Sequence, residues 1–138
     1  MTLVIDASIV MAWYFDDEKS PETDSVLELV GTQGALVPAL WSLEVANGFR
    51  TAIRRGRTER SYRDLALERL SMLAIEADND TVTHAWGATL ALADKHDLTP
   101  YDAAYLELAQ RKRVPLATLD SALRVAARSE GVTLTVSE

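Results

Sequence analysis

Short apolar runs alternate with stretches of helical pattern along the whole chain, and this alternation sets the fold class. The run at residues 3–5 is continuous and apolar, which is typical of a strand covered on both faces. Strands that alternate with helices form a mostly parallel sheet with helices on both faces. We therefore predict an α/β fold of about five strands, at residues 3–5, 35–37, 74–77, 115–119 and 132–136.

Caps and helix breakers predict the bounds of the helices between these strands. Ser20 and Pro21 form an N-cap followed by a first helical residue, and Thr99 and Pro100 repeat that pattern. A glycine after a periodic stretch predicts its end, as at Gly31. The predicted helices span residues 6–15, 21–30, 38–55, 61–73, 81–95, 100–113 and 121–128.

The length and composition are those of one globular domain, which we place at residues 1–138. The chain has no cysteine, which excludes disulfides, thiolate zinc sites and cysteine nucleophiles together. A net charge of −7 argues against a protein that coats nucleic acid by bulk electrostatics, but it does not exclude an enzyme that acts on nucleic acid. No apolar run reaches membrane-spanning length and no secretory signal is recognisable, so we expect a cytoplasmic protein that does not bind membranes.

Two of the predicted strands are followed by an aspartate. Asp6 comes after the first run, and Asp120 comes after the run at residues 115–119. Each precedes small residues and a helix, so each fits an N-cap as well as a place in a functional site. In open parallel sheets, ligands bind outside the carboxyl ends of the strands. Two acids at two strand ends favour a site at that edge, and the capping interpretation stays open for each one taken singly.

Two further carboxylates come from predicted helices. Asp102 is the third helical residue after Thr99, where an acid complements the helix dipole, and that helix end opens onto the same sheet edge. Glu44 lies within an apolar helix, one turn before Gly48, which is expected to leave open space beside the carboxylate. An interior helix can also carry a glutamate at its margin, so both residues keep a structural interpretation beside the functional one.

Four segments in chain order carry these acids: VIDASIV, SLEVANGF, TPYDAAYLELA and PLATLDSALR. Together they resemble the PIN domain, and within that family the VapC toxins of bacterial toxin–antitoxin pairs. The resemblance covers essentially the whole chain. It implies a metal-dependent endoribonuclease toxin that cleaves RNA phosphodiester bonds, is held inactive by a cognate VapB-type antitoxin, and forms a homodimer.

The resemblance also implies four catalytic acids, Asp6, Glu44, Asp102 and Asp120. Oxygen ligands without thiol or histidine partners favour hard cations, Mg²⁺ or Mn²⁺, over zinc. We expect Asp6, Asp102 and Asp120 to bind Mg²⁺, for which Mn²⁺ substitutes, and Glu44 to position or deprotonate the attacking water. The hydroxyls of Ser8 and Thr118, each two residues from an aspartate, are candidates for orienting the carboxylates.

The stretch RTAIRRGRTERSYR, at residues 50–63, gathers six arginines in a chain that is acidic overall. Arg50, Arg54 and Arg57 are candidates for pairing with RNA phosphates. The same residues are candidates for the surface that binds the antitoxin. A third interpretation is a solvated helix–turn–helix whose arginines pair with nearby acids.

Other proteins also place acids at the strand ends of a small parallel α/β domain. A phospho-receiver signalling module needs an acidic pair after the first strand and a lysine after the last one, whereas Asp6 is a single acid and no lysine ends a late strand. A haloacid-dehalogenase-type phosphatase needs an aspartate two residues after Asp6, where Ser8 stands. A catalytically silent PIN scaffold should have lost one of the four acids, and none is missing.

Overall fold

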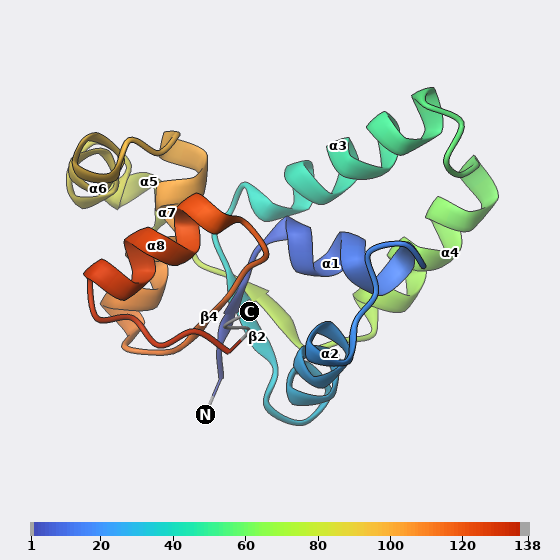
Figure 1. The fold of residues 1–138 in the computed structure, drawn as a ribbon, viewed down its shortest axis with the longest axis horizontal. Helices are drawn as coiled ribbons and strands as arrows, with labels where there is room; N and C mark the ends of the chain where they lie inside the picture. Colours follow the sequence, from blue (N-terminus) through green and yellow to red (C-terminus); the bar gives the residue numbers. More distant parts are fainter. Residues whose placement is uncertain (1, 136–138) are drawn as a thin grey trace.

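A parallel sheet of four strands lies at the centre of the molecule (Figure 1). The computed structural model describes residues 2–135. The strands are β1 (Val4–Ile5), β2 (Ala35–Val37), β3 (Ile75–Ala77) and β4 (Leu116–Ala117). They lie side by side in the order β3-β2-β1-β4, with Val4 opposite both Leu36 and Leu116. All three strand pairs are parallel, as the alternation of strands and helices predicts.

Helices cover both faces of this sheet. In chain order they are α1 (Ala7–Tyr14), α2 (Pro21–Gln33), α3 (Trp41–Arg54), α4 (Arg60–Ser71), α5 (Thr81–His84), α6 (Ala88–His96), α7 (Pro100–Lys112) and α8 (Ser121–Ser129). Ile5 belongs to a buried apolar cluster with residues of α1 to α4, and Val4 belongs to a second cluster with residues of α6 to α8. Because successive strand side chains point to opposite faces, each cluster fills one face of the sheet. Figure 1 shows these two groups of helices on either side of the strands.

The predicted fifth strand is reduced to a single bridge in the described residues. Leu134 pairs in parallel with Leu116. The N–H of Leu116 donates to the carbonyl of Thr133 at 2.9 Å, and the N–H of Thr135 donates to the carbonyl of Leu116 at 3.1 Å. Val136, the last residue of the predicted strand, lies outside the described residues. The sheet therefore has four strands where about five were predicted, and the C-terminal segment extends its β4 edge by one pair.

Three predicted helix bounds were wrong. α2 continues through Gly31 and is capped by Gly34, whose positive φ of 73° favours glycine. A glycine within a helix costs only about 1 kcal/mol relative to alanine, which the buried face of α2 offsets. α3 starts after a turn at residues 38–40 rather than at Pro38 itself. The predicted helix at residues 81–95 is divided into α5 and α6 around Gly87, whose backbone is not helical.

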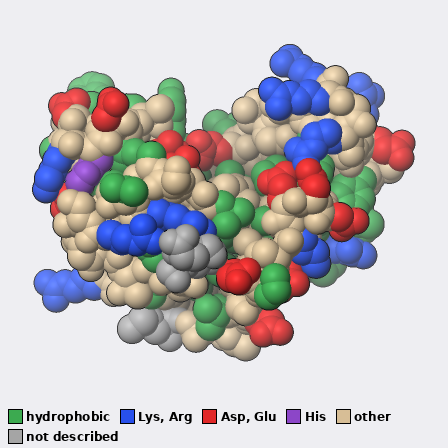
Figure 2. All heavy atoms as spheres, in the orientation of Figure 1, with side chains coloured by type: hydrophobic (Ala, Val, Ile, Leu, Met, Phe, Trp, Pro, Cys, Tyr) green, Lys and Arg blue, Asp and Glu red, His purple; other side chains and the backbone are tan. Residues whose placement is uncertain are grey.

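α3 and α4 form an arm that extends away from the sheet and turns back at residues 55–59 (Figure 1). Val45 and Phe49, four residues apart, are buried on the inner face of α3, where they hold it in the core with α1. Lys and Arg side chains gather over the outer end of this arm (Figure 2). Within residues 2–135, no helix has the length and apolar character needed to cross a membrane.

Candidate active site

The ends of two neighbouring strands bring Asp6 and Asp120 to the same edge of the sheet. Asp6 follows β1 directly, and Asp120 follows β4 after two further residues. Each caps the next helix: Asp6 accepts a hydrogen bond from the N–H of Ile9 at 3.3 Å, and Asp120 accepts one from the N–H of Leu123 at 2.8 Å. Capping and membership of an acidic site therefore coincide in these two residues.

Two hydroxyl groups hold the buried carboxylate of Asp6. The side chain of Ser8 donates to Oδ1 at 2.6 Å, and the hydroxyl of Thr118 donates to Oδ2. The same two hydroxyls accept hydrogen bonds from the backbone after β4, from Leu119 to Ser8 and from Asp120 to Thr118, each at 3.0 Å. Asp6 is thereby fixed against the segment that carries Asp120.

Burial raises the pKa of Asp6 to about 6. The hydrogen bonds from Ser8 and Thr118 favour the ionised form and limit this rise, while the negative charge of Asp102 adds to it. An aspartate that is held in place and yet costly to ionise in the metal-free protein is typical of a cation site or an acid–base centre.

Glu44 reaches the same region from α3. Its Oε1 accepts a hydrogen bond of 2.5 Å from the phenol of Tyr105, which projects from α7. Burial, and then the charge of Asp102, raise the pKa of Glu44, whereas the bond from Tyr105 lowers it. The pKa of Tyr105 lies above its usual range because the ring is buried and faces Glu44, so the phenol stays protonated and donates.

Asp102 is the residue through which the four acids interact. It lies in the first turn of α7, where its N–H donates to the hydroxyl of Thr99 at 3.1 Å. Burial raises the pKa of Asp102, and the negative charge of Asp120 raises it further. Since Asp102 also raises the pKa of Asp6 and of Glu44, the four predicted acids share one electrostatic environment at the carboxyl edge of the sheet. We refer to these four residues as the acidic centre.

The carboxylates of the acidic centre do not surround a single point. Within residues 2–135, no three His, Asp or Glu side chains lie close enough together to surround one metal ion. The donor set nevertheless suits a hard divalent cation, because every donor is a carboxylate oxygen. Raised pKa values at Asp6, Glu44 and Asp102 are the expected consequence of burial and like charge without a compensating cation.

An open groove of about 400 Å³ lies beside Glu44. Its other lining residues are Ala7, Leu40, Leu43, Asn47, Gly48 and Tyr101. A side chain on Gly48 would place its Cβ 2.8 Å from the sulfur of Met11, so this glycine allows close packing of α1 against α3. The open space that was expected beside Glu44 is present as this groove, and Gly48 is one of the residues that line it. The side chain of Met11 fills part of the space next to Gly48 itself.

The predicted arginines differ in their surroundings. Arg57 binds Asp17 at 3.0 Å and Glu18 at 2.9 Å, and its guanidinium lies 4.5 Å from the ring centroid of Phe15. Arg50 and Arg54 are exposed on α3 and form no ion pair with any part of the chain between residues 2 and 135. The structure therefore gives Arg57 an intramolecular role and leaves Arg50 and Arg54 facing solvent.

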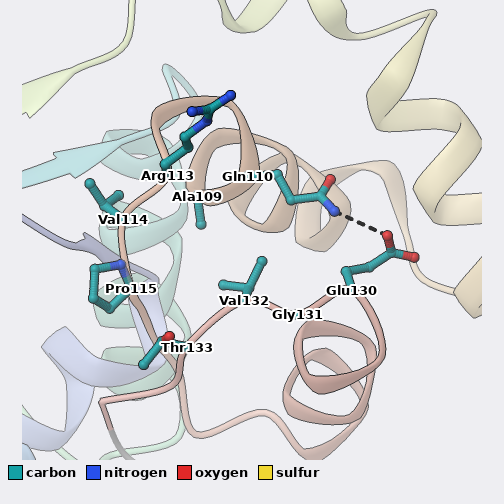
Figure 3. Close-up of a pocket in the computed structure, with 9 residues that line it drawn as sticks. All are labelled: Ala109, Gln110, Arg113, Val114, Pro115, Glu130, Gly131, Val132 and Thr133. Carbon is teal, nitrogen blue, oxygen red and sulfur yellow. Dashed lines mark hydrogen bonds between the residues drawn. The ribbon is translucent and has the colours of Figure 1, made fainter.

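A second hollow, of about 350 Å³, lies at the opposite end of α7 from Asp102 (Figure 3). On its wall, Gln110 donates to Glu130 at 3.0 Å. Lys95 and His96 also contact Glu130, and these contacts lower the pKa of Glu130 to about 2. None of the four acids lines this hollow, and its polar groups serve to tie the ends of α6, α7 and α8 together.

Tyr105 was not predicted as a site residue from the sequence. It follows Asp102 by three residues on α7, a spacing that places both side chains on the same face of a helix. The buried ion-pair network in which Arg111 binds Asp78 at 2.6 Å and Glu107 at 2.8 Å was not predicted either. The spacing to Asp102 was an available signal for Tyr105. No local signal pairs Asp78 with Arg111, because 33 residues separate them.

The fold and the site define a class of protein, a small parallel α/β domain with its acidic side chains at the carboxyl edge of the sheet. Residues 3–129 match the family model of the PIN domain, and the chain belongs to the PIN domain family. Membership of this family contradicts the phospho-receiver and phosphatase interpretations.

Individual relatives agree with this assignment. The ribonuclease VapC3 of Pyrobaculum aerophilum is 33% identical over 127 residues, which cover 89% of this chain and 92% of that protein. Solved structures with a similar fold include the following two. VapBC2 from Rickettsia felis, bound to a DNA fragment from their promoter, has a TM-score of 0.68 at 12% identity and covers 97% of both chains. A toxin–antitoxin complex from Klebsiella pneumoniae has a TM-score of 0.64 at 20% identity and covers 100% of both chains.

Proposed function

We propose that this protein is a metal-dependent endoribonuclease toxin whose activity is blocked by a VapB-type antitoxin. The observation that supports it most directly is that Asp6 and Asp120 follow two neighbouring parallel strands at one edge of the sheet, with Asp102 in the first turn of α7 close enough for its charge to raise the pKa of Asp6 and of Glu44. The similarity to a ribonuclease VapC over nearly the whole chain supports the choice of RNA as substrate.

Asp6, Asp102 and Asp120 would hold Mg²⁺, or Mn²⁺ in its place. A divalent ion at such a site neutralises phosphate charge and lowers the pKa of water to generate a nucleophile at neutral pH. Hydrogen bonds from Ser8 and Thr118 hold the carboxylate of Asp6 in place, so it would offer the ion a ligand at a fixed position. Glu44 is half-buried and its raised pKa suits a group that accepts a proton from the attacking water.

The activity is tested with purified protein and a fluorescently labelled RNA that contains single-stranded and base-paired regions. We expect cleavage with Mg²⁺ or Mn²⁺ and none in excess EDTA. Asp102→Asn should abolish cleavage without changing the circular dichroism spectrum. Asp94→Asn is the matched control, because Asp94 is an exposed acid on α6 outside the acidic centre. Full cleavage by Asp102→Asn, or in EDTA, would refute the proposal.

Exposed apolar side chains on α5, on α6 and in the turn between them support the homodimer that the family resemblance implies. Val82 and Trp86 are 82% and 92% exposed, and Leu90 follows Trp86 by four residues. Large apolar side chains gathered on a surface mark interaction sites more often than isolated ones do. Light scattering on the wild type and on Trp86→Ser, at the same concentration, tests this surface. A dimer that persists unchanged in the variant would exclude Trp86 from the dimer contact.

A further inference from the structure

Tyr105 combines complete burial with one polar contact directed at the acidic centre. The residue is only 1% exposed, and its ring belongs to the apolar cluster on the α6–α8 face of the sheet. Its hydroxyl donates to Oε1 of Glu44 at 2.5 Å. A tyrosine has two side-chain torsions, and packing on all sides fixes both. The hydroxyl is therefore a donor held at a fixed position.

The acids of the centre differ in what holds them. Asp6 is held by Ser8, by Thr118 and by a backbone N–H, and Asp120 is held by the backbone N–H of Leu123. Glu44 has a longer, half-buried side chain in the first turn of α3, and across residues 2–135 the Tyr105 hydroxyl is the one hydrogen-bond donor to its carboxylate. Without that donor, the Glu44 side chain could rotate toward the open groove that it lines.

We propose that Tyr105 is a positioning residue, which holds the Glu44 carboxylate toward the acidic centre so that Glu44 can act there. This inference rests on the proposed metal-dependent nuclease function. α7 supplies both parts of the arrangement, because Asp102 and Tyr105 lie three residues apart on one helix face. A shift of α3 relative to α7 would break the Tyr105–Glu44 bond, so the bond also fixes how the arm meets the helix that carries Asp102.

The experiment compares Tyr105→Phe with Tyr62→Phe. Both changes remove only a hydroxyl, and Tyr62 donates its hydroxyl bond to the carbonyl of Tyr14, on the α1–α4 side of the sheet. The readouts are the Mn²⁺ dissociation constant from calorimetry, the melting temperature in EDTA, and the rate of RNA cleavage. Loss of a group that orients a metal-site residue typically costs 10–100-fold in metal affinity or activity. We expect such a loss in the cleavage rate of Tyr105→Phe, because Glu44 is assigned to the attacking water and the other three acids to the ion, and wild-type values in Tyr62→Phe.

A double-mutant cycle separates positioning from general support of the fold. If Tyr105 acts only through Glu44, then Tyr105→Phe should cause no further loss of activity or Mn²⁺ affinity in a Glu44→Gln background. Additive losses would overturn the inference. Glu44→Asp keeps the charge but shortens the side chain by one methylene, so it should reproduce the loss seen in Tyr105→Phe. This variant tests the same contact if Tyr105→Phe does not fold.

The outcomes distinguish this inference from the proposed function. A wild type that cleaves RNA with Mn²⁺, together with a Tyr105→Phe variant of unchanged rate and Mn²⁺ affinity, overturns the role of Tyr105 and leaves the nuclease function intact. A wild type that neither binds Mn²⁺ nor cleaves RNA overturns both. A variant that melts at a lower temperature in EDTA but keeps wild-type Mn²⁺ affinity and rate would make Tyr105 a structural residue only, which also overturns the inference.

Discussion

Replacing Asp6 with asparagine should favour the fold of the metal-free protein more at neutral pH than at acidic pH. Burial raises the pKa of Asp6 from 3.8 to about 6. At 1.36 kcal/mol per pH unit, this difference corresponds to about 3 kcal/mol. The folded state therefore binds the Asp6 proton more tightly than the unfolded state does. Below about pH 4 the Asp6 carboxyl is mostly protonated in the folded and the unfolded state, so it costs little stability. Between about pH 4 and 6 the free energy of unfolding falls, because the unfolded state releases the proton first. Above about pH 6 the full cost of about 3 kcal/mol applies.

Asparagine at this position removes the charge but keeps most of the local structure. It is as good an N-cap as aspartate, so the bond from the Ile9 N–H is retained. The asparagine side chain has one oxygen that can accept from the hydroxyl of Ser8 or Thr118, where aspartate has two. The loss of the second acceptor lowers the free energy of unfolding by an amount that does not depend on pH. The stability of Asp6→Asn relative to the wild type should therefore improve by about 2–3 kcal/mol between pH 4 and pH 7.5.

The assay is urea unfolding of the wild type and Asp6→Asn in EDTA at several pH values from 4 to 7.5. Asp94→Asn is the control for removing one negative charge from an exposed position. A constant loss of about 0.5–2 kcal/mol at every pH would refute the reasoning and leave Asp6 as a helix cap only. With Mn²⁺ in place of EDTA, the melting temperature of the wild type should rise more than that of the variant, because only a state that binds the ion is stabilised by it.

Three other predictions follow from contacts described above. Arg50→Gln with Arg54→Gln should weaken RNA or antitoxin binding and reduce the salt dependence of RNA affinity, by about 0.7 in the log–log slope for each lost contact to single-stranded RNA; an unchanged affinity for both partners would make these arginines a solvated surface. Arg57→Gln should instead lower the melting temperature with little effect on RNA binding, because Arg57 already pairs within the chain. Arg111→Met should destabilise the fold by about 3–5 kcal/mol at pH 7, since it leaves the buried Asp78 without its partner. Arg111 lowers the pKa of Asp78, so this loss should shrink as the pH falls and the carboxyl is protonated in both variant and wild type; a loss independent of pH would contradict the ion-pair explanation.

The sequence predicted the acidic edge well because each signal there is local. Asp6 directly follows a short apolar strand, so its carboxylate lies at the carboxyl edge of the sheet once that strand pairs in parallel with a neighbour. In the structure this neighbour is β4. The Thr99 cap likewise predicts where α7 begins, and so where Asp102 lies. The capping and functional interpretations could not be separated in the sequence, because the same N-cap geometry serves both.

Features that depend on distant contacts could not be predicted from the sequence. Arg57 pairs with acids about 40 residues earlier in the chain, and no local pattern in the arginine-rich stretch indicates those partners. The interruption between α5 and α6 falls at Gly87, yet α2 passes through Gly31 without a break. Tertiary packing decides between these outcomes, since a single glycine changes helix stability by only about 1 kcal/mol.

The charge of Asp6 is difficult to explain by the needs of the fold alone. Capping α1 requires an oxygen acceptor, and serine or asparagine provides one as well as aspartate does. The hydroxyls of Ser8 and Thr118 can also be satisfied by neutral partners, because a hydroxyl both donates and accepts. Aspartate adds only a negative charge, in a place where burial and Asp102 make it costly. A second and a third acid with raised pKa, Glu44 and Asp102, lie at the same edge and increase that cost. A positive ligand at the acidic centre turns the same charges from a cost into an attraction, and this reversal is the physical reason to expect a cation there.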